Sequence, residues 1–358
     1  MNQPVITLGN KKISHNTPPY FIADIAANHD GDLDRALKLI ELAKEAGADC
    51  AKFQNFSAPT IVSKRGFESI GKKLSHQSSW NKSVYNVYQD ASIPIEWTPL
   101  LKDKCDDVGI EYLTTPYDHH SVDATDPFLN GYKIGSGDIS WIDFLEYVAT
   151  KNKPVLLATG ASAIDDVVRA VNSILAVNPL LILMQCNTNY TANPENYKYV
   201  NLNVLKQYRI LYPQCILGLS DHTFGHATVL GAITLGARVI EKHFTDDNSR
   251  TGPDHKFSMN PATWRDMVDR STELFMSLGD GNKKIEDNEQ ESFIVQRRGL
   301  YYKQNLEEGH ILSSNDVIPL RPFKEEGIHP YQLNDIVGKK LNQRVYEDQY
   351  ITWSELDD

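Results

Sequence analysis

Residues 20–56 read YFIADIAANHDGDLDRALKLIELAKEAGADCAKFQNF, and this stretch decides the fold. Its two ends, 20–28 and 50–56, are short apolar runs of the kind that form strands buried on both faces. Between them, a predicted helix ends at Gly47. Its apolar residues recur at helical spacing: Leu33, Ala36, Leu37, Ile40 and Ala43. A strand, a helix and a second strand predict a βαβ unit with parallel strands.

Eight apolar runs of this kind occur along the chain, with segments of helical period between them. They are YFIADIAAN (20–28), CAKFQNF (50–56), IEYLTTPY (110–117), GYKIGSGD (131–138), PVLLATGA (154–161), LILMQCNTNY (181–190), ILGLSDH (216–222) and ARVIEKHF (237–244). Eight alternating units predict an α/β protein with a (β/α)8 TIM barrel, and a doubly wound sheet is the structural alternative. The polar and aromatic insertion at 63–94 is expected to be a βα excursion near the barrel mouth.

A second, smaller domain is expected after the barrel. Hydrophobicity drops and charge rises around LGDGNKKIEDNEQES, which is typical of a linker. The predicted division is a barrel domain at 1–278, a linker at 279–296 and a small domain at 297–358. Because so few residues bury little apolar surface, we expect the small domain to rest on its own barrel or on a partner chain.

The composition excludes several classes of function. With 36 Lys and Arg against 47 Asp and Glu, the net charge is −11, and no basic run counteracts it, so a nucleic-acid partner is not expected. The four cysteines are widely spaced without a C-x-x-C pair, which favours reduced thiols in the cytoplasm. The sequence has neither a signal-peptide pattern nor an apolar run of membrane-spanning length, so no membrane partner is expected.

Polar residues gather where the predicted strands end, which is the catalytic rim of a (β/α)8 barrel. They are Asp24, Asn28, Lys52, Gln54, Thr115, Lys133, Ser136, Asp138, Thr159, Asn187, Thr188, Tyr190, Ser220, Asp221, His222, Glu241, Lys242 and His243. One polar strand end carries little information, but polar residues at all eight ends predict a pocket.

His222 and His243 end two adjacent predicted strands. A single histidine in such a place is more often a hydrogen-bonded core residue. Two neutral imidazoles beside carboxylates at an open rim suit a divalent first-row metal, with positions left for water and a substrate oxygen. An incomplete protein shell of this kind is typical of a catalytic metal.

Lys52 and Lys133 lie within apolar strands, where a lysine can simply extend to the rim. Two lysines in one pocket repel each other unless an anion lies between them. With nearby donors they could hold a phosphate and a carboxylate: Thr115, Ser136, Thr188 and Tyr190. The GSGD at 135–138 lacks the third glycine of a dinucleotide fingerprint, so its glycines are expected to allow close approach to a ligand.

Asp24, Asp138 and Asp254 are the candidate acids and bases. Each could instead cap a helix, which is the favoured interpretation for Asp221 before Thr223. Asp254 lies in TGPDHKFSM, a Gly-Pro loop just after the second histidine. From there it could bind substrate hydroxyls or exchange protons beside the metal.

At these residues the chain resembles the sialic acid synthase family, the phosphoenolpyruvate-condensing enzymes that make nonulosonic acids. The motifs are IADIAANHDGDLDRALKLIELAKEAGADCAKFQ, YKIGSGD, LLATG, GLSDHTFG, VIEKHFTDD and GPD, in family order and spacing, and the resemblance covers nearly the whole chain. After the linker, YYKQNLEEGHILSSNDVIPLRPF and LNDIVGKKL are similar to the family's C-terminal antifreeze-like (SAF) domain.

The resemblance implies a domain-swapped homodimer in which each SAF domain caps the partner's barrel. It implies that His222 and His243 bind Mn²⁺ or another divalent ion such as Mg²⁺ or Co²⁺. It also implies that six residues surround phosphoenolpyruvate: Lys52, Thr115, Lys133, Ser136, Thr188 and Tyr190. Asp254, with Asp24 and Asp138, would face the sugar, and Arg321 of the SAF domain would reach the partner's site.

Four departures from the family pattern concern the choice of sugar. Asp24 stands where glutamate is usual, so its carboxylate is one methylene shorter, and Ala158 stands where a serine is common. Thr188 replaces an asparagine of some members, and RPFKEEGI replaces a glycine-rich segment after the Arg-Pro.

The implied reaction is a metal-dependent condensation of phosphoenolpyruvate with an N-acetylmannosamine-type sugar, as in N-acetylneuraminate synthase. The acceptor stays open between N-acetylmannosamine, its 6-phosphate and the diacetamido sugars that lead to legionaminic or pseudaminic acid. A related sugar-acid synthase would act on an aldose phosphate, but no basic cluster for a second phosphate is evident. A metal-dependent hydrolase or epimerase would leave the two lysines without a role, and a non-catalytic carbohydrate-binding protein is the third alternative.

Overall fold

The computed structural model describes residues 4–73, 77–78 and 80–357. The chain divides into two compact units, Met1–Gly279 and Asp280–Asp358, so the division falls next to the expected end of the barrel domain.

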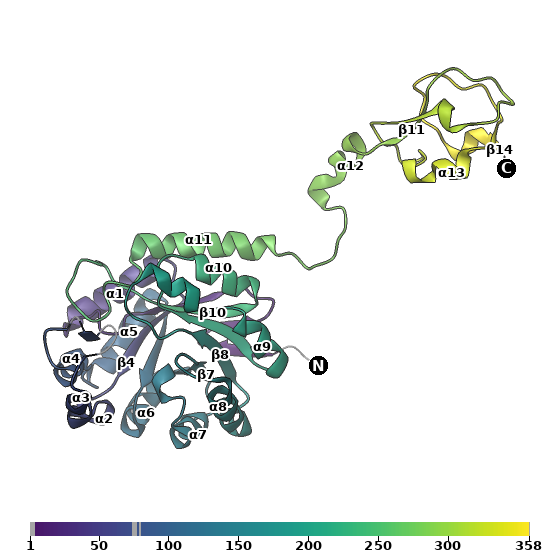
Figure 1. The fold of residues 1–358 in the computed structure, drawn as a ribbon. Coiled ribbons are helices and arrows are strands. Elements are labelled where there is room, and N and C mark those ends of the chain that lie inside the picture. The colour runs from purple at the N-terminus through teal and green to yellow at the C-terminus, as the bar shows by residue number, and fades with distance from the viewer. Residues whose placement is uncertain (1–3, 74–76, 79, 358) are drawn as a thin grey trace. The chain divides into compact units, whose positions relative to one another are not determined.

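The N-terminal unit is built on an eight-stranded parallel sheet (Figure 1). Its strands are β3 (Tyr20–Asp24), β4 (Cys50–Asn55), β5 (Glu111–Pro116), β6 (Tyr132–Ile134), β7 (Val155–Ala158), β8 (Leu181–Cys186), β9 (Ile216–Asp221) and β10 (Ala237–His243). Neighbours are hydrogen-bonded in the order β5-β4-β3-β10-β9-β8-β7-β6, and β5 also lies beside β6. The sheet is thus nearly closed into a barrel, and all eight predicted strands are confirmed.

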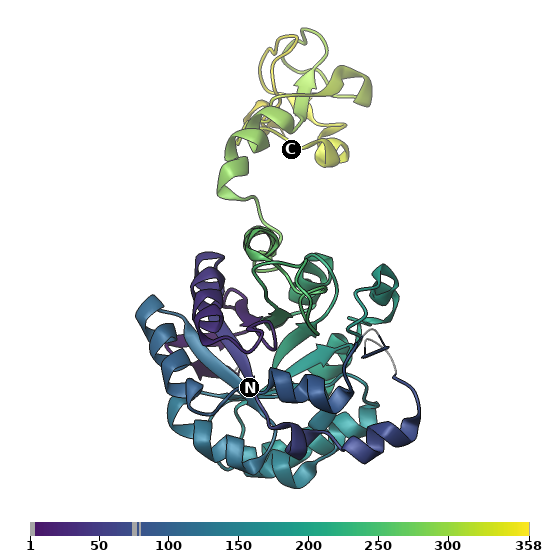
Figure 2. The same cartoon turned by 90° about the vertical axis from the view of Figure 1, so that its left-hand side faces the viewer.

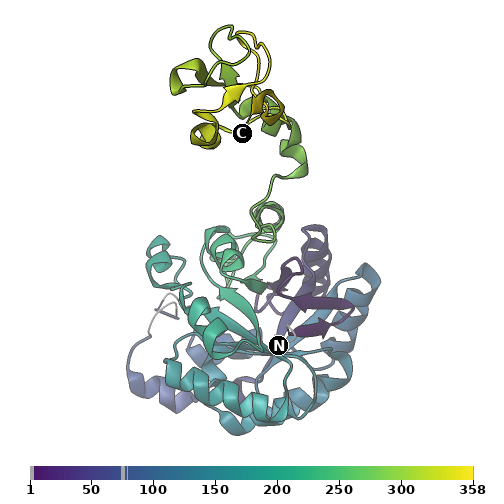
Figure 3. The ribbon, with the colours of Figure 1, turned by 90° about the vertical axis from the view of Figure 1, so that its right-hand side faces the viewer.

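Helices surround this sheet, as the two side views show (Figures 2 and 3). Eight of them are α1 (Leu33–Glu45), α5 (Trp97–Val108), α6 (His119–Thr125), α7 (Ile142–Ala149), α8 (Ile164–Val177), α9 (Val204–Leu211), α10 (Ala227–Thr234) and α11 (Pro261–Ser277). Helix α1 begins where the Asp32 side chain accepts a hydrogen bond from the Arg35 amide. The chain turns out of it at Gly47, whose φ of +94° suits a residue without a side chain.

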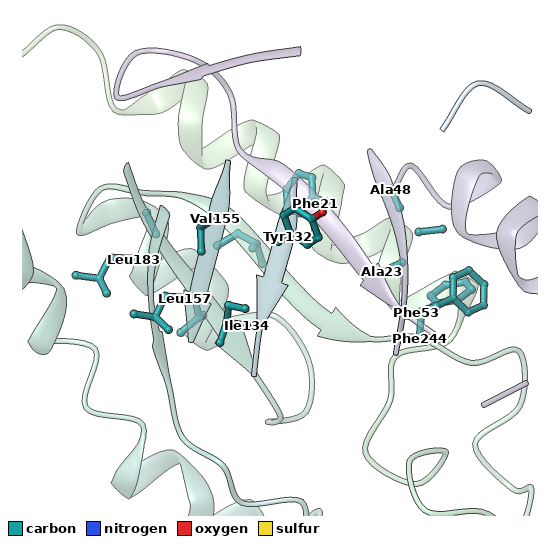
Figure 4. Packing of buried hydrophobic residues seen from close by; sticks show 14 of the residues in the cluster. Phe21, Ala23, Ala48, Phe53, Tyr132, Ile134, Val155, Leu157, Leu183 and Phe244 are labelled. Carbon is teal, nitrogen blue, oxygen red and sulfur yellow. The ribbon is translucent and has the colours of Figure 1, made fainter. Parts of the chain in front are cut away.

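Two apolar layers hold the barrel together. The larger lies between the sheet and the helices and includes Phe21, Tyr132 and Leu157, which Figure 4 shows on their strands. The smaller fills the barrel interior with residues of the opposite strand face, such as Ile22 and Leu156. Side chains that alternate between two buried faces explain why the strands read as continuous apolar runs.

An N-terminal hairpin, which the sequence analysis did not predict, adds to the interior layer. Strands β1 (Val5–Leu8) and β2 (Lys11–Ser14) pair antiparallel. Ile6, Leu8 and Ile13 are buried and pack with Tyr20, the first residue of β3. The hairpin therefore contributes to the end of the barrel where the strands begin.

The insertion at 63–94 forms helices α3 (Lys64–Ile70) and α4 (Val84–Ala91), preceded by the short α2 (Ala58–Ile61). It packs through aromatic rings: Phe56 lies 5.5 Å from Tyr88 and 5.7 Å from Tyr117, measured between centroids. Because Phe56 and Tyr117 directly follow the carboxyl ends of β4 and β5, the excursion lies at the barrel mouth, as predicted.

The C-terminal unit has a small apolar core of its own, which includes Leu300, Val345 and Ile351. Its elements are α12 (Gln290–Gln296), β11 (Gly299–Tyr302), β12 (Val317–Leu320), α13 (Leu333–Ile336), β13 (Lys340–Leu341) and β14 (Leu356–Asp357). Strand β11 pairs with β12 and β13 with β14, both antiparallel. The expected linker is not wholly irregular, since it contains α12. Of the helices described, none has the length and apolar character needed to cross a membrane.

Candidate active site

The carboxyl end of the barrel interior is charged, whereas the layers below it are apolar. Successive side chains of a strand point to opposite faces. Ile22 and Cys50 belong to the interior layer, so Asp24 and Lys52, two residues further along β3 and β4, also point inward. The same alternation directs Glu241 of β10 to the interior.

Two lysines and two carboxylates meet in this layer. Lys52 Nζ lies 2.7 Å from Asp24 Oδ2 and 3.9 Å from Glu241 Oε2, and Lys133 Nζ lies 2.9 Å from Glu241 Oε1. Ser220 Oγ donates a further hydrogen bond of 3.0 Å to Glu241. All five side chains are buried. The charges compensate one another, which is the condition for burying them.

The carboxylates and lysines of this layer shift one another's pKa values. Burial raises the pKa of Asp24, although Lys52 opposes this. For Glu241 the two lysines, with Lys133 first, outweigh burial and hold its pKa at about 2. Burial works against the charge of Lys52, but the carboxylates of Asp24 and Glu241 outweigh it and raise the Lys52 pKa. At neutral pH Lys52 is therefore an ammonium group beside the ionised Glu241.

Asp221 and Lys242 point the other way, toward the helices. They form a buried ion pair, and Asp221 also accepts hydrogen bonds from Thr223 and Thr228, the latter on α10. The Asp221 carboxylate accepts from the Thr223 amide as well, at 3.2 Å. The predicted helix-capping role of Asp221 is wrong, because the N-cap of α10 is His226, and Asp221 binds the loop residue Thr223 and the Thr228 hydroxyl instead. The ion pair of Asp221 and Lys242 belongs to the barrel wall outside the pocket.

Of the predicted phosphate donors, Thr115 contacts a lysine, and Ser136 and Thr188 lie beside Gly160. Thr115 Oγ1 accepts from Lys52 Nζ at 3.3 Å, and the Gly160 amide donates to Ser136 Oγ at 2.9 Å. A side chain at Gly160 would come within 2.6 Å of Thr188 and 3.0 Å of Ser136, so only glycine allows these two to lie so close.

His222 and His243 face each other, with ring centroids 5.4 Å apart. His222 Nδ1 lies 2.9 Å from the Asn187 carbonyl, which can only accept, so Nδ1 carries the proton and Nε2 keeps its lone pair. His243 Nδ1 is buried and has no hydrogen-bond partner among the residues that the structure describes. The Tyr190 ring packs 4.2 Å from His222, between centroids.

Both imidazoles are neutral at physiological pH. Burial, with the neighbouring His243, lowers the pKa of His222 to about 3, and burial, with Lys52, lowers the pKa of His243 to about 3. Neutral imidazoles are the form that binds metals. Within the described ranges, no group of three or more His, Cys, Asp or Glu side chains is arranged to hold a metal ion. His222 and His243 are two neutral imidazole donors, fewer than a closed protein shell would need.

The three candidate acids differ in their surroundings. Asp254 accepts from the Ala27 amide at 3.2 Å and lies 3.8 Å from His243 Nδ1. Burial raises its pKa to about 7, and the Asp24 charge adds to this. Burial likewise raises the pKa of Asp138 to about 6, and its Oδ2 has no hydrogen-bond partner among the described residues. Both can exchange a proton near neutral pH.

A cavity of about 160 Å³ opens beside Asp254. Gln54, His243 and Asp254 supply its polar end, which adjoins the charged layer. Its other lining residues are Ala27, Phe56, Ile61, Trp80, Val87, Tyr88, Ala91, Tyr117, Tyr190 and Pro253. Of the described residues that line it, none is a lysine or an arginine. The cavity fits a neutral molecule that has polar groups at one end and an apolar surface at the other.

Every predicted barrel-site residue thus lies at one end of the barrel. Arg321 belongs to the C-terminal unit, where it follows β12 and is exposed. Glu241, Tyr88 and Tyr117 had no predicted role. Glu241 was among the polar strand ends, and its position two residues before His243 on the same strand face could have given it a role in the pocket. The position of Tyr88 depends on how the excursion folds, which strand periodicity does not encode.

Comparison with known proteins identifies the family of both units. A sequence profile of the NeuB family matches residues 39–283, and one of the SAF domain matches residues 297–357. An N,N'-diacetyllegionaminic acid synthase of Legionella pneumophila is 33% identical, over 94% of each chain. The human N-acetylneuraminate-9-phosphate synthase is 31% identical, over 93% of this chain and 91% of its own.

The fold has a matching solved structure. The N-acetylneuraminic acid synthetase of Leptospira borgpetersenii superposes with a TM-score of 0.72 at 29% identity. The match covers 81% of this chain and 95% of that one. A relative named for N-acetylneuraminic acid synthesis therefore has this fold.

Proposed function

Since the chain belongs to the NeuB family, we propose that it is a nonulosonic acid synthase that condenses phosphoenolpyruvate with an N-acetylmannosamine-type sugar. The observation that carries this is the buried layer of Lys52, Lys133 and Glu241 next to two neutral histidines. A metal-dependent hydrolase or epimerase does not explain why two lysines are buried here. A substrate with two or three negative charges does, because the lysines can bind it.

The lysines bind phosphoenolpyruvate in this proposal. Its phosphate and carboxylate bring the negative charge that Lys52 and Lys133 now receive only from Asp24 and Glu241. Thr115, Ser136, Thr188 and Tyr190 add polar contacts around it. This local positive charge counteracts the net charge of −11, which repels the substrate at a distance.

The reaction joins two carbons and releases phosphate. C3 of phosphoenolpyruvate attacks the aldehyde carbon of the open-chain sugar, which forms the new C–C bond and leaves an alcohol. Water adds to C2, and phosphate leaves by cleavage of the C–O bond. Asp24, Asp138 and Asp254 are the proposed proton carriers, because the pKa values of the last two, about 6 and about 7, allow exchange at neutral pH.

His222 and His243 fit a divalent metal, Mn²⁺ or a similar ion such as Mg²⁺ or Co²⁺. Their neutral rings, the free lone pair on His222 Nε2 and the unpartnered His243 Nδ1 suit such an ion. When bound there, it would supply positive charge that polarises the aldehyde oxygen or activates water. The two histidine rings are themselves held in place. The Asn187 carbonyl and the Tyr190 ring contact His222, and the Phe257 ring packs against His243.

The acceptor is proposed to be unphosphorylated. A sugar phosphate needs lysine or arginine at its phosphate, and the described lining of the cavity has neither. N-acetylmannosamine is the first candidate. A diacetamido hexose is the second, favoured by the apolar end formed by Ile61, Val87 and Ala91 and by the likeness to a legionaminic acid synthase.

The working enzyme is proposed to be a cytoplasmic homodimer in which Arg321 of one chain contacts the sugar in the partner's barrel. The support is the family resemblance together with the small core of the C-terminal unit. The four cysteines form no disulfide, which agrees with a reducing compartment.

The test is phosphate release from phosphoenolpyruvate by EDTA-treated protein, with and without added Mn²⁺. The sugar panel contains N-acetylmannosamine, its 6-phosphate and diacetamido hexoses. We expect metal-dependent release with one unphosphorylated sugar, and its loss in His222→Ala and His243→Ala. His226→Ala, a histidine on the same loop that pairs with Asp266 instead, is the matched control. No release with any sugar in the presence of metal would refute the proposal.

A further inference from the structure

His255 is fully buried next to Asp254, but it does not line the cavity. Both of its ring nitrogens have partners: Nε2 lies 2.9 Å from Asp30 Oδ1, and Nδ1 lies 2.7 Å from Thr245 Oγ1. Because an ionised carboxylate can only accept, Nε2 donates to Asp30. The ring is therefore held at both ends and cannot turn without breaking a buried hydrogen bond.

Asp30 is itself fixed in the loop between β3 and α1. Its Oδ2 lies 2.7 Å from Arg250 Nη2 and 3.3 Å from Arg35 Nε. Its backbone has a φ of +54°, an unfavourable value for a residue other than glycine. The contacts of the side chain thus hold a strained turn in one conformation.

The loop that carries Asp254 lies directly against the His255 ring. A Cβ at Gly252 would come within 2.6 Å of His255 Cδ2, so the Gly-Pro turn leaves no space above the imidazole. On the other side, Ser258 Oγ donates to the Asp254 carbonyl at 2.7 Å, and Asn28 Nδ2 donates to Ser258 at 2.9 Å. Two anchors therefore flank Asp254.

We propose that His255 and Asp30 form a positioning pair, which sets the place of the Asp254 carboxylate between the Ala27 amide and His243. This inference rests on the proposed function, in which Asp254 faces the acceptor sugar. The pair touches no reacting group. It ties the loop after β10 to the loop after β3, so that the polar end of the cavity keeps its shape.

Steady-state kinetics of His255→Ala test the pair. We expect kcat/KM for the acceptor sugar to fall by about 10- to 100-fold, because a misplaced catalytic group costs this much. The KM for phosphoenolpyruvate should change by less than about twofold. His255→Gln keeps a donor near Asp30 and should recover part of the loss. His226→Ala removes a histidine from another His–Asp pair and should leave all constants unchanged.

A double-mutant cycle distinguishes positioning from general destabilisation. In an Asp254→Ala background there is no carboxylate to place, so adding His255→Ala should lower kcat/KM by no more than about twofold. Multiplied effects of the two changes would overturn the proposal. So would an equal rise in KM for both substrates, or no recovery with His255→Gln.

Failure of the proposed function would look different. If the wild-type chain released no phosphate with any sugar of the panel, amide hydrogen exchange would test the pair on its own. His255→Ala should then speed exchange in the loop of residues 248–258 and leave β10 protected. Unchanged exchange in that loop would overturn the positioning role whatever the reaction is.

Discussion

Glu241 lies between two buried lysines, 2.9 Å from one and 3.9 Å from the other. We expect Glu241→Gln to lower the free energy of unfolding by about 3–5 kcal/mol, because it leaves Lys133 without its carboxylate. Phosphoenolpyruvate, itself an anion, should restore more of the lost stability in the variant than it adds to the wild type. Thermal unfolding with and without phosphoenolpyruvate measures both.

Ser220→Ala is the control for Glu241→Gln, since it removes a hydrogen bond to Glu241 but no charge. It should cost about 1 kcal/mol. If phosphoenolpyruvate stabilised Glu241→Gln no more than the wild type, the lysines would not be its binding groups.

Asp138 makes stability depend on pH. Burial raises its pKa from 3.8 to about 6, so the folded chain holds the proton more tightly than the unfolded chain. This contribution to the free energy of unfolding is fully present below about pH 4 and is lost as the pH rises to about 6, by at most about 3 kcal/mol. Asp138→Asn lacks it.

Urea unfolding at several pH values between about 4 and 7 measures this for Asp138. The stability of Asp138→Asn relative to wild type should rise with pH and become constant above about pH 6. Asp143→Asn, at an exposed carboxylate of α7, controls for the loss of an acid. The same difference at every pH would show that Asp138 is not perturbed by burial.

The alternation of inward and outward positions along each strand explains which parts of the site the sequence could predict. Asp24, Lys52 and His243 lie at inward positions of apolar strands, and the alternation that buries their neighbours also aims them at the pocket. Lys242 lies at an outward position of its strand and pairs with Asp221 outside the pocket. The position of Asp254 depends on contacts with Ala27 and on a loop without periodicity, so only the structure reveals it.

At the scale of elements, a mutation in the β1–β2 hairpin should change stability without changing catalysis. Leu8 is 1% exposed, and a side chain on Gly131 would come within 2.7 Å of it, so this end of the barrel is closely packed. Leu8→Ala should lower the free energy of unfolding by about 2–5 kcal/mol through the cavity it leaves. Its kcat/KM should stay unchanged at temperatures where it is folded, because the site lies at the opposite strand ends.

Val5→Ala on the same strand is the matched control for Leu8→Ala, since Val5 is 54% exposed. Its effect should stay within about 0.5 kcal/mol. A loss of activity in folded Leu8→Ala would mean that the hairpin also shapes the catalytic end.

Elements with strong periodicity were predictable, and short ones were not. The eight strands and α1 follow from apolar spacing and from stop residues such as Gly47. The four-residue strands of the hairpin carry too little pattern: only Ile6, Leu8 and Ile13 are buried in it. Helix α12 has no buried residue among those described, so no amphipathic pattern in the sequence predicts it.

For the whole molecule, the proposal that Arg321 contacts the sugar raises the question of which barrel it serves. The barrel unit contains the lysines, the histidines and the cavity, whereas Arg321 belongs to the unit that follows Gly279. A residue of the second unit can serve a barrel of its own chain or of a partner. In a twofold dimer the second arrangement occurs twice, by symmetry.

Mixing two defective variants decides between these arrangements. Arg321→Ala should raise the KM for the sugar and spare that for phosphoenolpyruvate, while His243→Ala should abolish metal-dependent turnover. If Arg321 acts on the partner's barrel, a mixed dimer has one complete site: the barrel of the first variant receives Arg321 from the second. Equal amounts, exchanged by dilution and reassociation, should recover about a quarter of the wild-type sites. If Arg321 acts within its own chain, no mixture recovers activity, and the swapped dimer is wrong.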